Sequence, residues 1–133
     1  MTAPATVFVY GTLTDPGTAD RLLPSVDYRG RATLVGLHRV DGDYPTLAPG
    51  GEVAGRLLRT TALDALDAYE GVDRGLYVRV SIPVADADGE TVECYVGDPD
   101  ALGAPADWPG DGPFADRVRA HCRDAGVVVE PRE

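Results

Sequence analysis

Short runs of β-branched and aromatic residues, separated by glycine, proline and aspartate, recur along this 133-residue chain. Runs of this kind predict strands that are bounded by turns. Asp86-Ala87-Asp88-Gly89 has the composition of a hairpin turn, so the strands on either side of it are expected to pair directly. The predicted strands are Thr6–Tyr10, 31–40 (interrupted by Gly36), 53–58, 76–84, 91–96 and 127–129.

Three other segments have the pattern of short helices. Each combines an apolar side with residues that commonly begin or end helices. The predicted helices are 16–23 (Asp15-Pro16 at the start), 62–69 (Thr60 or Thr61 before it, Gly71 after it) and 113–125 (Pro113 first, Gly126 after it). Two stretches that are rich in turn-forming residues, 44–51 and 97–112, predict loops.

The order of these elements is strand, helix, several strands, helix, hairpin and helix. This order predicts an α+β fold with a small mixed or mostly antiparallel β-barrel and flanking helices. A chain of 133 residues, 44% of them hydrophobic, is long enough for one real core, so we expect a single domain over 1–133.

Targeting and metal signals are weak in this sequence. No apolar run approaches the roughly 18 residues of a membrane span, and Met1-Thr2-Ala3-Pro4 does not resemble a signal peptide. We therefore expect a cytoplasmic protein. Cys94 and Cys122 belong to no CxxC or Cys/His cluster and are predicted to be small apolar fillers. His38 and His121 are isolated, which gives a metal site little support.

The charged residues are unusual. All 12 basic residues are arginine, and with 16 aspartates and 6 glutamates they give a net charge of −10. A GC-rich genome favours arginine over lysine, but it does not explain the acidic excess. A surface of short carboxylates without lysine resembles proteins of salt-loving organisms, in which salt screens the repulsion. The negative charge also argues against nucleic acid and anionic membranes as partners.

Tyr10-Gly11-Thr12-Leu13 is the first candidate for a functional site, because it leads from a strand through a turn to a helix. Glycine allows a sharp turn, so successive N–H groups can point into one concavity. Such a concavity binds a carboxylate without any cationic side chain. A plain turn would have the same sequence, and this motif alone leaves both interpretations open.

Glu70 is the second candidate. It follows the apolar face of the second predicted helix, where the helix dipole disfavours a negative charge. Asp67 and Asp73, each three residues away, act in the same direction, so we expect a raised pKa for Glu70. A carboxyl group of this kind can transfer protons near neutral pH. An ion pair with Arg74 would cancel the effect, and a solvated surface glutamate is the alternative.

Four short motifs occur in one order along the chain. They are Val7-Phe8-Val9-Tyr10-Gly11-Thr12-Leu13, Tyr44-Pro45 through Gly55-Arg56-Leu57, Leu63-Asp64-Ala65-Leu66-Asp67-Ala68-Tyr69-Glu70-Gly71, and Tyr77-Val78-Arg79. Together they resemble the γ-glutamylcyclotransferase-like family, and especially its small γ-glutamylamine cyclotransferase branch. The resemblance spans roughly residues 7 to 96.

The resemblance implies a compact β-barrel with flanking helices and no cofactor. It implies that the amides of Gly11 to Leu13 hold the α-carboxylate end of a small γ-glutamyl substrate. It also implies that Glu70 is the acid/base that cyclises this group to 5-oxoproline and releases the attached amine. Aromatic residues close the pocket in this family, and Tyr77 and Tyr95 are the candidates here, with Tyr44 a weaker one. Neither the amine nor an oligomeric state follows from these residues.

Three other functions fit the same residues. A binding or regulatory module would keep the fold and the carboxylate site without turnover. An amidohydrolase would use Glu70 to activate water and would release glutamate instead of 5-oxoproline. A purely structural barrel would leave Glu70 exposed and far from the Gly11 amides.

If the acidic excess is an adaptation to salt, raising sodium chloride from low to molar concentrations should raise the Tm. The physical reason is that salt screens the repulsion among the carboxylates. Thermal melts followed by circular dichroism at neutral pH measure this change. A Tm that falls over the same range contradicts the halophilic interpretation.

Overall fold

The computed structural model describes residues 4–11, 14, 16–23, 26–87 and 89–132. The strands are β1 (Ala5–Val9), β2 (Asp27–Val40), β3 (Thr46–Thr60), β4 (Tyr77–Pro83), β5 (Thr91–Gly97) and β6 (Val128–Arg132). The helices are α1 (Pro16–Leu22), α2 (Leu63–Glu70), the 3₁₀ helix η2 (Val72–Arg74), α3 (Pro99–Leu102) and α4 (Phe114–Ala125). Within the described ranges, no helix combines the length and the apolar character needed to cross a membrane.

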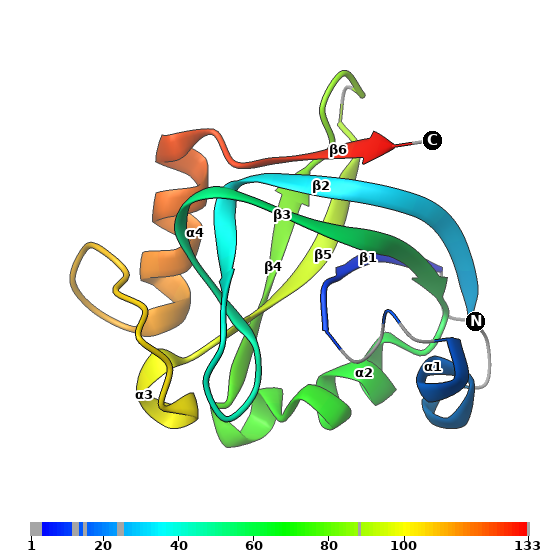
Figure 1. Cartoon of the computed structure of the whole chain (residues 1–133), viewed down its shortest axis with the longest axis horizontal. Coiled ribbons are helices and arrows are strands. Elements are labelled where there is room, and N and C mark those ends of the chain that lie inside the picture. Colours follow the sequence, from blue (N-terminus) through cyan, green and yellow to red (C-terminus); the bar gives the residue numbers. More distant parts are fainter. Residues whose placement is uncertain (1–3, 12–13, 15, 24–25, 88, 133) are drawn as a thin grey trace.

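The strands form one sheet in the order β4-β5-β1-β3-β2-β6, which curls into a half-barrel (Figure 1). β1 lies inside this order, antiparallel to β3 and parallel to β5. The ladders between β4 and β5, β2 and β3, and β2 and β6 are antiparallel. This arrangement confirms the predicted α+β fold with a mixed, mostly antiparallel, barrel-like sheet and flanking helices.

The side chains of β1 alternate between two apolar clusters, because successive residues of a strand face opposite sides of a sheet. Phe8 belongs to the larger cluster, together with Val118 of α4. Val7 and Val9 belong to the second cluster, together with Leu66 of α2. Full burial of such a side chain contributes about 1.5–3 kcal/mol, so β1 helps to hold helices against both faces of the sheet.

The loop predicted for 44–51 is confirmed at Tyr44 and Pro45 and wrong from Thr46 onward. β3 begins at Thr46 and continues through Pro49, Gly50 and Gly51 as one long strand. Pro49 lies opposite Leu37 of β2 and beyond the part of β3 that pairs with β1, a position at a strand edge of the kind that tolerates proline. Both glycines have a positive φ and lie at a register shift between β2 and β3. They therefore form a bulge in the hairpin instead of ending a strand.

The loop predicted for 97–112 is wrong in part, because it contains α3. This short helix begins after Asp98, whose side chain accepts a hydrogen bond from the Asp100 N–H at 2.9 Å. The hairpin between β4 and β5 is confirmed, with Tyr77 opposite Gly97 at its open end. Asp88 of the predicted hairpin turn lies outside the described residues.

The predictions for helix ends are partly confirmed. α2 ends at Gly71 and α4 at Gly126, and both glycines adopt the left-handed conformation. The start of α2 differs, because its N-cap is Ala62 and Thr60 Oγ1 accepts the Ala62 N–H at 3.0 Å. The N-cap predicted at Asp15 lies outside the described residues.

A side chain at Gly55 would collide with β1. Its Cβ would overlap the Val9 carbonyl oxygen and come within 2.6 Å of Phe8 Cζ. We expect Gly55→Ala to lower the free energy of unfolding by about 3 kcal/mol, the upper end of overpacking costs. Urea unfolding followed by tryptophan fluorescence measures this loss. Gly126→Ala is the control, because its Cβ meets nothing within 4 Å and only the left-handed backbone costs about 1 kcal/mol. Equal losses in the two variants would contradict the crowding argument.

Candidate active site

A cavity of about 290 Å³ lies between the end of α2, the end of β1 and strands β4 and β5. Its size is near the lower end of small-molecule sites, which are mostly apolar with a few polar groups. It is lined by Phe8, Val9, Tyr10, Gly11, Tyr44, Pro45, Tyr69, Glu70, Arg74, Leu76, Tyr77 and Tyr95. The predicted site residues among these are Tyr10, Gly11, Glu70, Tyr77 and Tyr95, while Thr12 and Leu13 lie outside the described residues.

Glu70 is the last residue of α2, and the left-handed Gly71 after it turns the chain away. Its side chain is mostly buried, and this burial raises the pKa of its carboxyl group to about 7. The raised pKa is the one expected, but its cause is the loss of contact with water rather than the neighbouring acids. Arg74 lines the same cavity and, among the described residues, forms no ion pair with Glu70.

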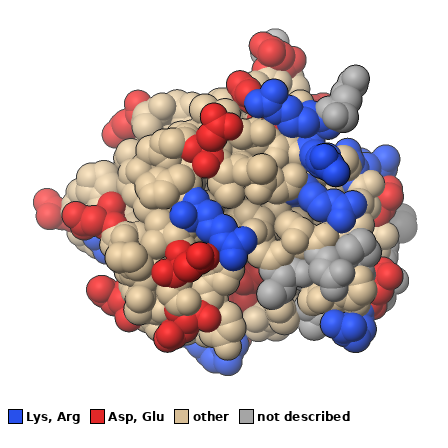
Figure 2. Space-filling model, viewed as in Figure 1, with Lys and Arg blue, Asp and Glu red and all other residues tan. Residues whose placement is uncertain are grey.

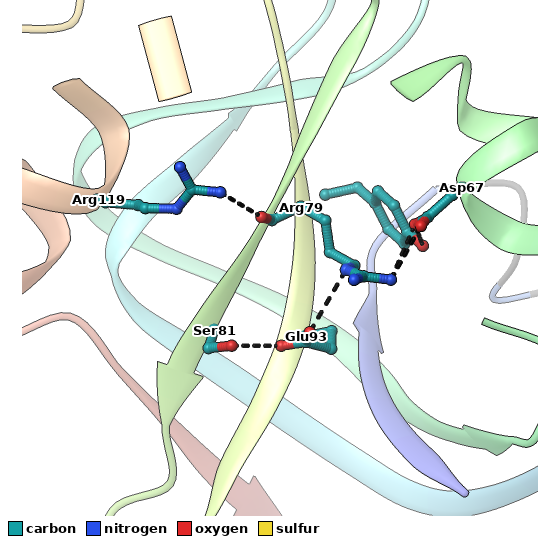
Figure 3. A network of polar contacts seen from close by, with 6 residues as sticks. Asp67, Arg79, Ser81, Glu93 and Arg119 are labelled. Atoms are coloured by element: carbon teal, nitrogen blue, oxygen red, sulfur yellow. Dashed lines mark hydrogen bonds and ion pairs between the residues drawn. The ribbon is translucent and has the colours of Figure 1, made fainter. Parts of the chain in front are cut away.

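Asp67, one helical turn before Glu70, ties α2 to the sheet (Figure 3). Its two carboxylate oxygens lie 2.9 and 3.2 Å from Arg79 Nη1 of β4, and the Tyr95 hydroxyl of β5 donates to it at 2.6 Å. Arg79 Nε also lies 3.4 Å from Glu93 Oε1. The Arg79 and Asp67 side chains are 31% and 24% exposed, so water screens this pair only partly. Glu70 therefore lies at the end of a helical turn whose Asp67 is bonded to both β4 and β5.

Three tyrosines form much of the polar wall of the cavity. Tyr10 Oη donates to the Tyr95 carbonyl at 2.6 Å, and Tyr77 Oη donates to the Pro45 carbonyl at 2.5 Å. Burial raises the pKa of all three phenols, so they stay protonated. The charge of Glu70 adds to the rise in pKa of Tyr10 and Tyr77. These two hydroxyls are therefore close enough to interact with its carboxyl group.

The turn after β1 is held at both ends by arginines. Arg39 Nη1 donates to the Tyr10 carbonyl at 3.1 Å, and Arg56 Nη1 donates to the Thr14 carbonyl at 2.9 Å. The Gly11 carbonyl accepts the N–H and the hydroxyl of Thr14 at 3.0 and 2.7 Å. Gly11 does not have a positive φ, but a Cβ there would lie 3.3 Å from a proline ring of the β2–β3 hairpin. This glycine therefore provides space rather than an unusual backbone angle.

Tyr44, Tyr69 and Arg74 lie at the exposed side of the cavity. The two tyrosines are 61% and 40% exposed, and Arg74 is exposed as well. The spacing of three residues in the sequence predicts one apolar face of α2 with Leu63, Leu66 and Tyr69, but Leu66 is its buried member and Tyr69 is exposed. Tyr44, the weaker candidate in the sequence, contributes to the cavity after all.

Sequence reasoning missed some contributions to this cavity. Phe8 and Leu76 line it, but their apolar pattern does not differ from that of residues in an ordinary core. The role of Asp67 had one signal, its spacing of three residues from Glu70, which places both on one helix side. Among the described residues, no group of three His, Cys, Asp or Glu side chains is placed to hold a metal ion.

The raised pKa of Glu70 makes stability depend on pH. The folded chain keeps the Glu70 proton up to a pH of about 7, whereas the unfolded chain releases it near 4.5. The folded state therefore binds more protons in this window, and stability falls as the pH rises through it. We expect Glu70→Gln to exceed the parent chain in stability above this window by up to about 3 kcal/mol, and to match it below.

Urea unfolding over a series of pH values measures this difference. Glu90→Gln is the matched control, because Glu90 is exposed and its removal should leave the pH profile unchanged. Parallel profiles for Glu70→Gln and the parent chain would contradict the raised pKa.

Comparisons of the sequence and the structure with known proteins point to the same family. The model of the family described as gamma-glutamyl cyclotransferase, AIG2-like, matches residues 7–108. AIG2-like protein A of Arabidopsis thaliana is 32% identical over 109 residues, which cover 73% of this chain and 66% of the plant protein, slightly less than two thirds of its length.

Solved structures share the fold. A structure described as gamma-glutamyl cyclotransferase aligns with a TM-score of 0.62 and 18% identity, covering 93% of this chain and 81% of that chain. An uncharacterized human protein aligns with a TM-score of 0.64 and 21% identity, covering 92% of this chain and 80% of that chain. The match over residues 7–108 includes the whole cavity lining, and it shows that the chain belongs to the gamma-glutamyl cyclotransferase, AIG2-like family.

Proposed function

We propose that this chain is an enzyme that cyclises the γ-glutamyl group of a γ-glutamyl amide or amine to 5-oxoproline and releases the attached amine. The observation that carries the proposal is a single cavity holding both a carboxyl group with a pKa of about 7 and the turn after β1. Membership of the family supports the γ-glutamyl group as the part of the substrate that is recognised. The volume of about 290 Å³ suits a unit of that size.

The proposed reaction is an intramolecular substitution. The α-amine attacks its own side-chain carbonyl carbon, the new N–C bond closes a five-membered lactam, and the bond to the departing nitrogen breaks. At neutral pH the α-ammonium loses two protons in all, and the departing nitrogen gains two as it leaves as an ammonium. The substrate itself supplies proximity, so the enzyme has to hold the reactive conformer and transfer protons.

Glu70 suits the transfer of these protons. With a pKa of about 7, its basic and acidic forms are both populated near neutral pH. Among the described lining residues it is the one carboxyl group. The Tyr10 and Tyr77 hydroxyls stay protonated and donate to backbone carbonyls, so they shape the wall without competing for this role. Glu70 takes a proton from the attacking nitrogen and returns one to the departing nitrogen.

Different parts of the cavity lining suit the two ends of the substrate. The turn after β1, held by Arg39 and Arg56, is the proposed site for the α-carboxylate end. The departing amine then extends toward the exposed side, where Tyr44, Tyr69 and Arg74 would contact it.

We expect Glu70→Gln to lower kcat by about 100- to 10,000-fold, the usual contribution of general acid–base catalysis, with a smaller change in KM. Mass spectrometry of 5-oxoproline released from a panel of γ-glutamyl amides and amines measures the rate. The rate of the parent chain should depend on an ionisation near the Glu70 pKa of about 7. Glu90→Gln, at an exposed position, should keep full activity.

Other outcomes separate the competing functions. Undiminished turnover by Glu70→Gln rejects the role of Glu70. Release of glutamate in place of 5-oxoproline identifies an amidohydrolase. Binding of 5-oxoproline with no compound of the panel consumed identifies a non-catalytic binding module.

A further inference from the structure

A second hollow, of about 660 Å³, is lined by Arg29, Gly30, Arg31, Arg56 and Arg132. We call it the arginine hollow. It shares no lining residue with the cavity around Glu70. Figure 2 shows arginines gathered toward the upper right of one face, the region where β2 and β6 lie in Figure 1, whereas acidic side chains are spread over the rest of that face.

Three of these arginines are direct neighbours across the sheet. Arg31 of β2 pairs in register with Arg56 of β3 on one side and with Arg132 of β6 on the other. Residues in register on adjacent strands project from the same face. Like charges directly opposite one another destabilise a sheet, so this row of three arginines works against folding unless something else compensates the charge.

The described residues compensate this charge only in part. Arg29 lies 3.2 Å from Asp27, and Arg132 lies 3.6 Å from Glu130, so among the described residues two carboxylates face four guanidinium groups. Arg31 is the middle arginine of the row, and the described residues provide no ion pair or hydrogen bond for its side chain.

Arg56 and Arg132 also have contacts with uncharged groups. Arg56 donates to the Thr14 carbonyl and lies 4.1 Å above the centre of the Tyr28 ring. Arg132 Nε donates to Thr33 Oγ1 at 3.1 Å. These contacts orient the two guanidinium groups beside Arg31 without neutralising them. Counted over the described part of the chain, the hollow therefore keeps an excess of positive charge in a protein whose net charge is −10.

We propose that the arginine hollow binds a small phosphate-bearing molecule, at a site separate from the cavity around Glu70. Guanidinium groups match phosphate oxygens in geometry and charge. A terminal phosphate presents three oxygens, and the row presents arginines from three adjacent strands, whereas a single carboxylate offers only two oxygens.

The surrounding charge favours a small ligand over a nucleic acid. Electrostatic interactions extend about 8 Å at physiological salt, so an anion that stays inside the hollow is attracted by the arginines. A long polyanion would also run across the acidic remainder of the surface and be repelled there. The backbone helps as well, because Gly30 contributes no side chain to fill the hollow.

Pyrophosphate is the probe for this site, added to the full chain against chloride at matched ionic strength. A saturable rise in Tm is expected, about 10 °C at a 100-fold excess over Kd. Arg31→Gln should abolish this rise, and its own Tm in chloride should not fall, because it removes a like-charge neighbour. Arg123→Gln is the control, since Arg123 is exposed on α4 and pairs with Asp124. Arg132→Gln provides a second variant that should also lose the response.

Several results would overturn the proposal. These are no rise in Tm with pyrophosphate, an equal rise in Arg31→Gln and the parent chain, or an equal rise with citrate, which would indicate carboxylate binding. Tighter binding of a single-stranded oligonucleotide than of pyrophosphate would also overturn the choice of a small ligand. None of these outcomes depends on turnover of a γ-glutamyl compound, so the two proposals fail independently.

Discussion

Helix α2 is tied to the sheet through Asp67, and the position of Glu70 depends on that tie. Asp67 accepts hydrogen bonds from Arg79 of β4 and from the hydroxyl of Tyr95 of β5, and the Tyr95 carbonyl in turn accepts the hydroxyl of Tyr10. One continuous set of polar contacts thus joins the helix, two strands and the end of β1 around the cavity. Replacing either Asp67 or Arg79 would leave the charge of the other residue unpaired in a partly buried position. Such a replacement is therefore expected to destabilise the fold.

Elements with local signals could be predicted from the sequence. For β1, the β4–β5 hairpin and α4, the residues of the element itself contain both the periodic apolar pattern and the residues that begin or end it. The segment 46–51 could not be predicted correctly, because Pro-Gly-Gly has the same composition in a turn and in a bulge. Its partner strand β2 decides between them. The parallel pairing of β1 with β5 depends on the whole topology, and no feature of either strand indicates it.

The sequence indicated several of the residues that line the candidate site, but not the physical reasons for their properties. The resemblance to a known family pointed to Glu70 and to the tyrosines, and the pKa of Glu70 is raised as expected. Its cause is burial, which depends on packing between distant segments and has no signature near position 70. Similarly, Gly11 was expected to allow a sharp turn, whereas its φ is not positive and a Cβ at this position would crowd the β2–β3 hairpin. The spacing of three residues indicated that Asp67 and Glu70 lie on the same side of helix α2. It did not indicate that Asp67 would bind residues of β4 and β5.

The place of β1 in the sheet has a consequence for how the chain is made. β1 is synthesised before the other five strands of the sheet, yet the bond between Tyr10 and Tyr95 joins residues that are 85 positions apart. Contacts of such long range form slowly, because a long loop must close before they are made. Until residues 91–97 have been synthesised, the edge of β1 that pairs with β5 has no partner. That edge is a template for pairing with other nascent chains, so the strand that leads to the cavity is open to aggregation while the chain is being synthesised.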